Sequence, residues 1–157
     1  MAAKKALEKA IKKRGKKLII SSVYRSITSQ YLRYKYFKQG QCGLPLTSIP
    51  RKSTHQTGLA IDIEDYKGWQ PYLESEGWKW FGAFDSDHFD FFRSGVSDIS
   101  KLPIKSFQQL WNLNNPEDKL LENGVFDSKT EKRLNQALAD GFPKGEKCSI
   151  ECGFIFQ

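Results

Sequence analysis

The spacing of apolar positions in the first forty residues predicts a helix, a strand and a second helix. Residues 2–17 place their apolar side chains on one face at the helical period. The run 18–24, LIISSVY, is rich in β-formers and predicts a buried strand. Either Ser26 or Thr28 can cap the second helix, which we expect over residues 29–38.

The middle of the chain predicts short elements of both kinds. Residues 40–54 are rich in Gly, Pro and Ser and predict a long loop. Residues 59–63 and 88–92 are short β-rich runs, and residues 69–75 can form a helix between them. Because helical and strand patterns are mixed along the chain, we expect an α+β fold with a small antiparallel sheet.

After about Ser97 the pattern becomes helical throughout. One helix is indicated by apolar spacing around residues 104–111, and a turn-rich linker follows over residues 114–124. Ser128 can cap a last helix over residues 130–138.

This change of pattern divides the chain into a first domain, a small helical module and a tail. A module of about 45 residues is small for independent stability, so we expect it to be supported by the first domain. The expected segments are residues 1–97, 98–142 and 143–157.

The net charge of +7 originates in one segment. Residues 1–17 hold eight of the 25 Lys and Arg residues and only one of the 18 acidic residues, so the remainder is balanced. Residues 59–98, in contrast, hold nine acids and three bases. The basic segment is either a solvated helix face or a surface that attracts a polyanion such as cell wall or nucleic acid.

Composition excludes disordered and membrane-spanning chains. With 27% charged and 13% aromatic residues the chain has material for a core. No apolar run approaches the ~18–20 residues of a membrane span, and the basic first stretch lacks the apolar core of a signal peptide. Cys42, Cys148 and Cys152 permit either one disulfide with one thiol or three thiols.

The two histidines lie in surroundings that point to a metal. Asp62 stands in an apolar run seven residues after His55, and a buried carboxylate needs a partner such as a cation. With His88, these residues supply two imidazoles and one carboxylate, a set that suits Zn²⁺ with a fourth position left for water. Structural zinc usually has four ligands, often Cys, so a catalytic site is the better interpretation.

The residues around both histidines resemble a known family. The string SxHxxGxAxD, a Trp-rich segment and an (E/D)xxHxD element are similar to the M15 zinc peptidases, which include D-alanyl-D-alanine carboxypeptidases, dipeptidases and phage endolysin peptidases. An upstream S-x-Y-R element and a Gln after it also match, so that the resemblance spans roughly residues 18–92. The matching residues are Ser22, Tyr24, Arg25, Gln30, Ser53, His55, Gly58, Ala60, Asp62, Asp85, His88 and Asp90.

The resemblance implies an α+β fold whose small antiparallel sheet carries one zinc ion per chain. The implied site consists of the ligands His55, Asp62 and His88, the general base Asp85, and the substrate-facing residues Arg25, Gln30 and Ser53. Many relatives have Glu in place of Asp85. Asp90 is either a hydrogen-bond partner of a ligand His or a surface acid.

The C-terminal segment has a resemblance of its own. IKSFQQLWNLNN followed by ENGVFDSKTEKRL is similar to the helical peptidoglycan-binding module found beside wall hydrolases. This implies that residues 98–142 bind the cell wall. The alternative is a helical extension that only stabilises the first domain.

Together these observations predict a zinc peptidase that cleaves peptidoglycan stem peptides, most simply a D-alanyl-D-alanine carboxypeptidase. The alternatives are an endolysin-like peptidoglycan endopeptidase and a wall-binding module that holds zinc without turnover. A nucleic-acid-binding protein is the weakest hypothesis, because its bases are confined to one terminal segment. We expect a monomer that acts in the cell wall or periplasm, with no nucleic-acid partner and no signal peptide in this chain.

Overall fold

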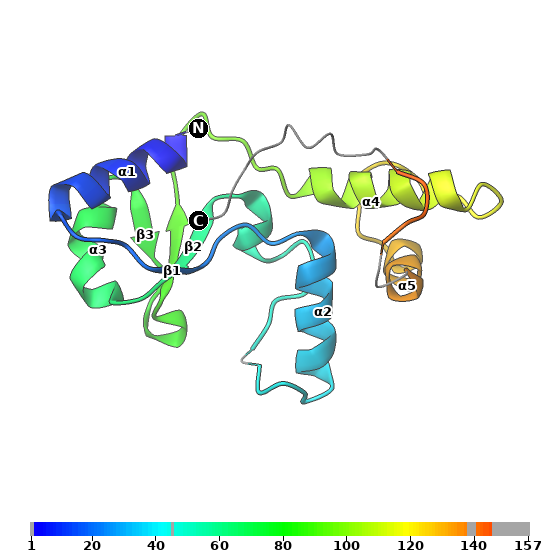
Figure 1. Cartoon of the computed structure of the whole chain (residues 1–157), viewed down its shortest axis with the longest axis horizontal. Helices are drawn as coiled ribbons and strands as arrows, with labels where there is room; N and C mark the ends of the chain where they lie inside the picture. Colours follow the sequence, from blue (N-terminus) through cyan, green and yellow to red (C-terminus); the bar gives the residue numbers. More distant parts are fainter. Residues whose placement is uncertain (1, 45, 138–140, 146–157) are drawn as a thin grey trace. The chain divides into compact units, whose positions relative to one another are not determined.

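The computed structural model describes residues 2–44, 46–137 and 141–145, and the chain divides into two compact units (Figure 1). The first unit is Met1–Pro103 and the second is Ile104–Gln157. The boundary expected after residue 97 stays a prediction. Cys148 and Cys152 lie outside the described residues, and Cys42 is an exposed free thiol.

The first unit combines helices with a small antiparallel sheet, so the predicted α+β class is confirmed. Its helices are α1 (Ala2–Arg14), α2 (Ile27–Lys38) and α3 (Tyr66–Glu74). Its strands are β1 (Ile20–Ser22), β2 (Ala60–Ile63), β3 (Trp78–Trp80) and β4 (His88–Phe91), and two short 3₁₀ turns are η1 (Thr54–Thr57) and η2 (Ala83–Asp85).

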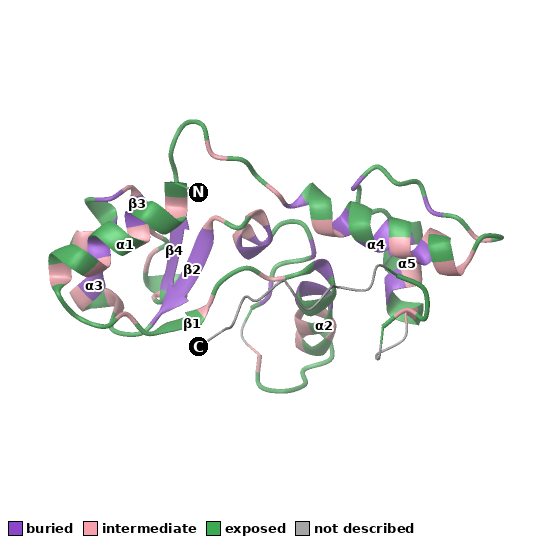
Figure 2. Ribbon diagram, turned by 45° about the horizontal axis from the view of Figure 1, so that its top comes forward, coloured by how far each residue is buried: buried purple, intermediate pink, exposed green. Residues whose placement is uncertain are grey.

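The sheet has the order β1-β2-β4-β3, and every neighbouring pair is antiparallel. In the central pair, Ile61 faces Phe89 and Asp62 faces His88 across the strands. Because side chains alternate between the faces of a sheet, this register sends the apolar residues to one face and the polar residues to the other. Both central strands are buried along their whole length (Figure 2).

Helices α1 and α3 lie on one side of the sheet and α2 lies on the other (Figures 1 and 2). The apolar face packs against Ala6 and Ala10 of α1 and against Trp69 and Leu73 of α3. Arg14 at the end of α1 lies over the Trp69 ring at 4.3 Å from its centroid and pairs with an aspartate at the start of α3. This face therefore forms the hydrophobic core of the unit.

The first helices agree with the sequence, whereas the first strand does not. Ser26 caps α2 by accepting a hydrogen bond from the backbone N–H of Ser29 at 3.2 Å. The expectation of a buried strand over 18–24 was wrong, because only Ile20–Ser22 pairs and its side chains are largely exposed. The physical reason is its place at the sheet edge, where one side of the strand has no neighbouring strand among the described residues.

The second unit contains α4 (Lys101–Asn114), which begins just before the unit boundary, and α5 (Ser128–Gln136). The apolar positions predicted for the first of these helices, including Phe107 and Trp111, are buried. The cap of α5 is Asp127 rather than Ser128; its carboxylate accepts from the backbone N–H of Thr130 at 2.7 Å. In the described part of the chain, no helix is long and apolar enough to cross a membrane.

Candidate active site

His55 is held in η1 with its ring orientation fixed by the backbone. Its Nδ1 lies 2.6 Å from the carbonyl oxygen of Val23, which can only accept a hydrogen bond. The backbone N–H of Arg25 in turn donates to the His55 carbonyl at 3.2 Å. Gly58 ends the turn in the left-handed region at φ 74°, which glycine adopts without strain. Because Nδ1 carries the proton, the neutral ring presents Nε2 as a lone pair.

His88 is fixed in the complementary way at the start of β4. Its Nε2 lies 3.0 Å from Oδ1 of Asp90 and 3.2 Å from Oγ1 of Thr54. The carboxylate of Asp90 accepts the Nε2 proton, so the neutral His88 ring presents Nδ1 as a lone pair. Asp90 is buried, and it therefore lies as a hydrogen-bond partner of the predicted ligand and not as a surface acid.

The three predicted metal ligands converge on one point. The distance from His55 Nε2 to Asp62 Oδ1 is 3.0 Å, and from His88 Nδ1 to the same oxygen it is 2.8 Å. The two ring nitrogens are 3.2 Å apart. With neutral rings these atoms are three facing electron-pair donors, which repel one another unless a cation or proton lies between them. The donor set is that of a catalytic zinc site, so the residues fit the metal.

The pKa shifts of His88 and Asp62 also indicate that the cluster favours a positive charge beside the carboxylate. Burial disfavours the charged imidazolium, but hydrogen bonds with Asp62 and Asp90 outweigh it and raise the pKa of His88 to about 9. Burial likewise opposes ionisation of Asp62, yet its hydrogen bonds with His55 and His88 hold its pKa well below the usual range. The site therefore stabilises an anionic carboxylate together with positive charge beside it.

Arg25 follows β1 and is bound to the predicted metal ligand Asp62. Its Nη2 donates to Asp62 Oδ2 at 2.8 Å, the oxygen that does not face the histidines. Its Nε donates to Ser22 Oγ at 3.1 Å, and its Nη1 lies 3.4 Å from Gln30 Oε1. Burial lowers the pKa of Arg25, the charge of Asp62 raises it, and the positive charge of Arg33 lowers it further.

Gln30 and Ser53, both predicted to line the peptide site, are buried. Gln30 is 0% exposed, and its Nε2 donates to the carbonyl of Ser48 at 2.7 Å while its Oε1 faces Arg25. Ser53 directly precedes η1 and makes no side-chain cap bond to it. The structure thus brings Gln30 to Arg25 and places Ser53 two residues before His55, and a contact of either with substrate stays a prediction.

Asp85 ends η2, and the turn that follows returns its carboxylate toward His88. Its Oδ2 lies 4.0 Å from His88 Nδ1, and its side chain is 54% exposed. Burial raises the pKa of Asp85, the positive charge of His88 lowers it, and the neighbouring Asp62 and Asp87 raise it, with a net increase. Asp87 is exposed, and its carbonyl accepts from Ile63 N at 3.0 Å to extend the β2–β4 ladder.

Three contacts of the site were not predicted from the sequence. The Val23 carbonyl and Thr54 orient the two histidine rings, and Phe81 meets the His88 ring edge to face at 5.4 Å between centroids. Thr54 stands inside the recognised motif, so its position was a usable signal. Val23 lies inside the S-x-Y-R element and Phe81 inside the Trp-rich segment, but neither motif indicates which group faces a histidine ring.

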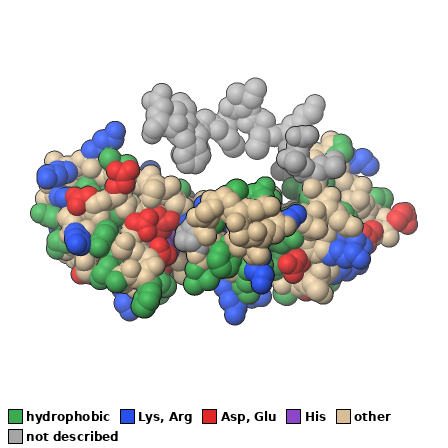
Figure 3. All heavy atoms as spheres, turned by 90° about the horizontal axis from the view of Figure 1, so that it is seen from below, with side chains coloured by type: hydrophobic (Ala, Val, Ile, Leu, Met, Phe, Trp, Pro, Cys, Tyr) green, Lys and Arg blue, Asp and Glu red, His purple; other side chains and the backbone are tan. Residues whose placement is uncertain are grey.

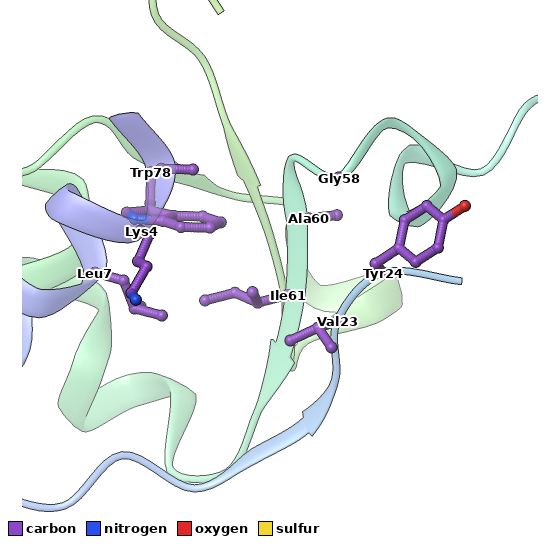
Figure 4. A pocket seen from close by; sticks show the side chains of 9 residues that line it. Lys4, Leu7, Val23, Tyr24, Gly58, Ala60, Ile61 and Trp78 are labelled. Atoms are coloured by element: carbon purple, nitrogen blue, oxygen red, sulfur yellow. The ribbon is translucent and has the colours of Figure 1, made fainter. Parts of the chain in front are cut away.

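Acidic side chains gather on the face of the molecule seen in Figure 3, where they border the visible part of a histidine. A separate cavity of about 170 Å³ lies between α1 and β2, lined by apolar side chains that include Leu7, Ile61 and Trp78 (Figure 4). None of the predicted catalytic, substrate-binding or metal-binding residues lines this cavity. The chemistry is therefore concentrated at the histidine–aspartate cluster on the opposite face of the sheet.

In this α+β unit, the sheet and the adjoining turn η1 hold two imidazoles and one carboxylate, with a further carboxylate at their edge. This is the arrangement of a metal-dependent hydrolase. The family model for VanY, described as D-alanyl-D-alanine carboxypeptidase, matches residues 1–95. Because this is more than half of the chain, the chain belongs to the VanY family. The predicted resemblance to M15 peptidases is thereby confirmed.

Membership of this family makes the chain a peptidoglycan-acting, D-alanyl-D-alanine carboxypeptidase-like peptidase at family level. A comparison with curated proteins finds no match. The family match ends before the second unit. The resemblance of residues 98–142 to a wall-binding module therefore stays a prediction.

Proposed function

We propose that this chain is a zinc-dependent peptidase that cleaves peptidoglycan stem peptides, most simply as a D-alanyl-D-alanine carboxypeptidase. The observation that carries the proposal is the convergence of His55 Nε2, Asp62 Oδ1 and His88 Nδ1 within 2.8–3.2 Å of one another. A peptidoglycan substrate also agrees with the family. Because peptidoglycan lies in the cell wall or periplasm, the chain is proposed to act there.

The proposed metal ligands are His55, Asp62 and His88, one zinc per chain. Bound there, zinc supplies a Lewis acid that polarises a peptide carbonyl and makes water a stronger nucleophile at neutral pH. Val23 and Asp90 keep the proton on the far nitrogen of each ring, so that both near nitrogens remain available as ligands.

Asp85 is the proposed general base. Its carboxylate is exposed enough to meet water and lies at the edge of the ligand cluster, 4.0 Å from His88 Nδ1. A pKa raised toward neutrality improves a carboxylate as a proton acceptor, and the raised pKa of Asp85 has that direction. In the proposed reaction it takes the proton of the attacking water and returns it to the leaving amine.

Arg25 has two roles in this proposal. Its bond to Asp62 Oδ2 turns the opposite carboxylate oxygen toward the histidines. A guanidinium has five N–H donors, and the three contacts of Arg25 leave donors on both Nη atoms for a substrate carbonyl. Gln30 holds Arg25 in place, while Ser53 is proposed to line the peptide site.

The test is product analysis on defined stem peptides. The full chain is incubated with a stem peptide and one equivalent of zinc, and the products are identified by mass spectrometry. The peptide should lose a single C-terminal D-alanine, and a chelator should stop this cleavage. Cleavage between inner residues would favour the endopeptidase alternative instead. Zinc binding without any cleavage would leave only the wall-binding alternative.

We also propose that the second unit binds the cell wall. Ending the chain after Ser100 retains the packing of Ile99 near Gly58 and removes α4 and α5. The shortened protein should cleave small soluble peptides at a rate close to that of the full chain and should sediment less with insoluble wall sacculi. Loss of folding on truncation would instead assign the second unit a structural role.

A further inference from the structure

Arg25, the arginine that the sequence singled out for substrate, has its positive charge balanced within the protein. It forms an ion pair with Asp62 at 2.8 Å, and its other contacts go to Ser22 and Gln30. The side chain is 16% exposed. It can offer a hydrogen bond to substrate, but its charge is already engaged by a carboxylate.

A second arginine lies on the same side of α2 as the residue that holds Arg25. Arg33 follows Gln30 by three residues, which puts it on the same helix face about 4.5 Å further along the axis. Side chains on a helix lean toward its N-terminus, so a long side chain at this position reaches back toward Gln30 and Arg25. The positive charge of Arg33 also acts on Arg25. Burial lowers the pKa of Arg25 most, the charge of Asp62 raises it, and the charge of Arg33 lowers it.

Arg33 has no acceptor for its charge among the residues that the structure describes. Its Nε is buried without a hydrogen-bond partner, and no described carboxylate lies within ion-pair distance of it. Arg14 and Arg133 differ in this respect, because they pair with Asp65 and Asp118. Arg51 and Arg93 also have no described carboxylate within ion-pair distance, but neither lies on α2. A buried donor without a partner destabilises the protein, because its hydration is lost without replacement. A bound anion would remove this destabilisation.

The proposed reaction supplies an anion close to the scissile bond. In a carboxypeptidase substrate the terminal carboxylate lies one residue beyond the scissile carbonyl, about 3.8 Å along the chain. Arg25 contacts the metal ligand Asp62 directly. Arg33 follows three residues along α2 from Gln30, the residue that contacts Arg25. Asp85 lies beside His88 with Asp87 next to it, and both carboxylates repel another carboxylate. A cation without a carboxylate of its own is therefore needed to hold it.

We propose that Arg33 binds the C-terminal carboxylate of the peptide substrate and thereby makes the enzyme select a free chain end over an internal bond. The planar guanidinium fork matches the two oxygens of a carboxylate, which an ammonium group cannot reproduce. The proposal rests on the proposed peptidase function and assigns its exopeptidase specificity to one residue.

The experiment measures carboxylate recognition separately from catalysis. Acetyl-D-Ala-D-Ala and its C-terminal amide are titrated by calorimetry into the full-length, metal-free chain, which cleaves neither. Hydrogen bonds to charged groups contribute about 1.5–3 kcal/mol, so the wild-type chain should bind the free acid about 10- to 100-fold more tightly than the amide. Arg33→Gln should abolish this preference, and Arg33→Lys should restore only a part of it.

Lys38→Gln is the matched control, because it removes one positive charge from the exposed end of the same helix. It should keep the full preference for the free acid. Thermal unfolding of each variant verifies that the fold is retained. Equal or undetectable binding of both peptides by the wild-type chain overturns the proposal, as does an undiminished preference in Arg33→Gln.

Cleavage by the zinc-loaded chain then tests the proposed function independently. If the metal-free chain selects the free acid through Arg33 but the zinc-loaded chain releases no product, the recognition site stands and the peptidase function fails. If the free acid is cleaved by wild type and Arg33→Gln with the same preference over the amide, the function stands and the role of Arg33 is refuted.

Discussion

The two faces of the β2–β4 strand pair are both buried and are chemically opposite. On one face Ile61 and Phe89 pack beneath α1 and α3, and on the other Asp62 and His88 meet with Asp90 beside them. The apolar face stabilises the fold in proportion to the area it removes from water, about 25 cal/mol per Å². The polar face instead loses hydration. The free-energy cost of this loss is compensated only by hydrogen bonds within the cluster and by a positive charge at its centre. Stability and chemistry thus occupy opposite sides of the same two strands.

Replacing a ligand on the polar face should have the largest effect. His55→Ala or His88→Ala should reduce bound zinc from about one equivalent to a small fraction of that amount, because three protein ligands hold a catalytic zinc. Peptide release should be abolished with the loss of zinc. Metal analysis of protein purified without chelator measures the first effect. Full zinc content in either variant would exclude this cluster as the metal site.

A matched pair of variants distinguishes the proposed general base Asp85 from the neighbouring Asp87. Asp85→Asn should keep its zinc and lose about 10²- to 10⁴-fold in kcat, the usual contribution of a general base. Asp87→Asn removes the same charge two residues away and should remain within a few-fold of wild type. Steady-state kinetics on one stem peptide decides the ranking. The reverse ranking would transfer the proton-accepting role to Asp87.

On the apolar face a truncation should act on stability and leave the chemistry intact. Leu73 is 0% exposed in the core beneath the sheet, so Leu73→Ala should lower the free energy of unfolding by about 2–5 kcal/mol. Urea unfolding of the zinc-free chain measures it. Below the unfolding transition the variant should still bind about one zinc ion, as one metal site per chain requires. A loss of zinc from the folded variant would show that the two faces are coupled.

A change in the second unit sets the baseline for the comparison. Asp127 caps α5 in the second unit, and Asp127→Ala should cost about 1 kcal/mol with no effect on zinc. Hydrogen bonds from the backbone and side chain of Thr130 lower the pKa of Asp127. A depressed pKa in the folded state means that the stabilisation is present above the unfolded value of about 3.9 and is lost as the pH falls through the lower folded value.

Urea unfolding at several pH values measures this smallest effect. The difference between wild type and Asp127→Ala should be constant near neutral pH and should shrink in strong acid. A difference that grows on acidification would contradict the assigned cap.

Elements defined by a local period were predictable from the sequence. The apolar stripe of α1, the cap at Ser26 and the buried positions of α4 all depend on neighbours three or four residues away. The β-rich run at residues 59–63 likewise located β2, whereas η1 was expected to be part of a loop. His55, Gly58 and Asp62 stand in one short motif. The metal-binding cluster could therefore be named before the fold was known, although the roles of its members stay proposals.

Elements defined by distant partners could not be predicted in this way. The run LIISSVY predicts a buried strand, yet β1 lies at the edge of the sheet. The residues of a strand do not indicate how many neighbouring strands it will have. Strand β3 was not recognised within its Trp-rich segment, because three residues are too few to show a period. Its pairing with β4 supplies the stabilisation that its own sequence does not signal.

The sequence by itself determined which residue types could bind a metal and which helices would form, because ligand chemistry and helical periodicity are properties of neighbouring residues. Only the tertiary structure decided which ring nitrogen faces the metal position and which of Arg25 and Arg33 keeps its charge available. The Val23 carbonyl turns His55, and Asp62 engages Arg25 while Arg33 is left without a described carboxylate. These outcomes depend on hydrogen bonds between segments 32 and 37 residues apart, whose geometry is fixed only when the sheet closes.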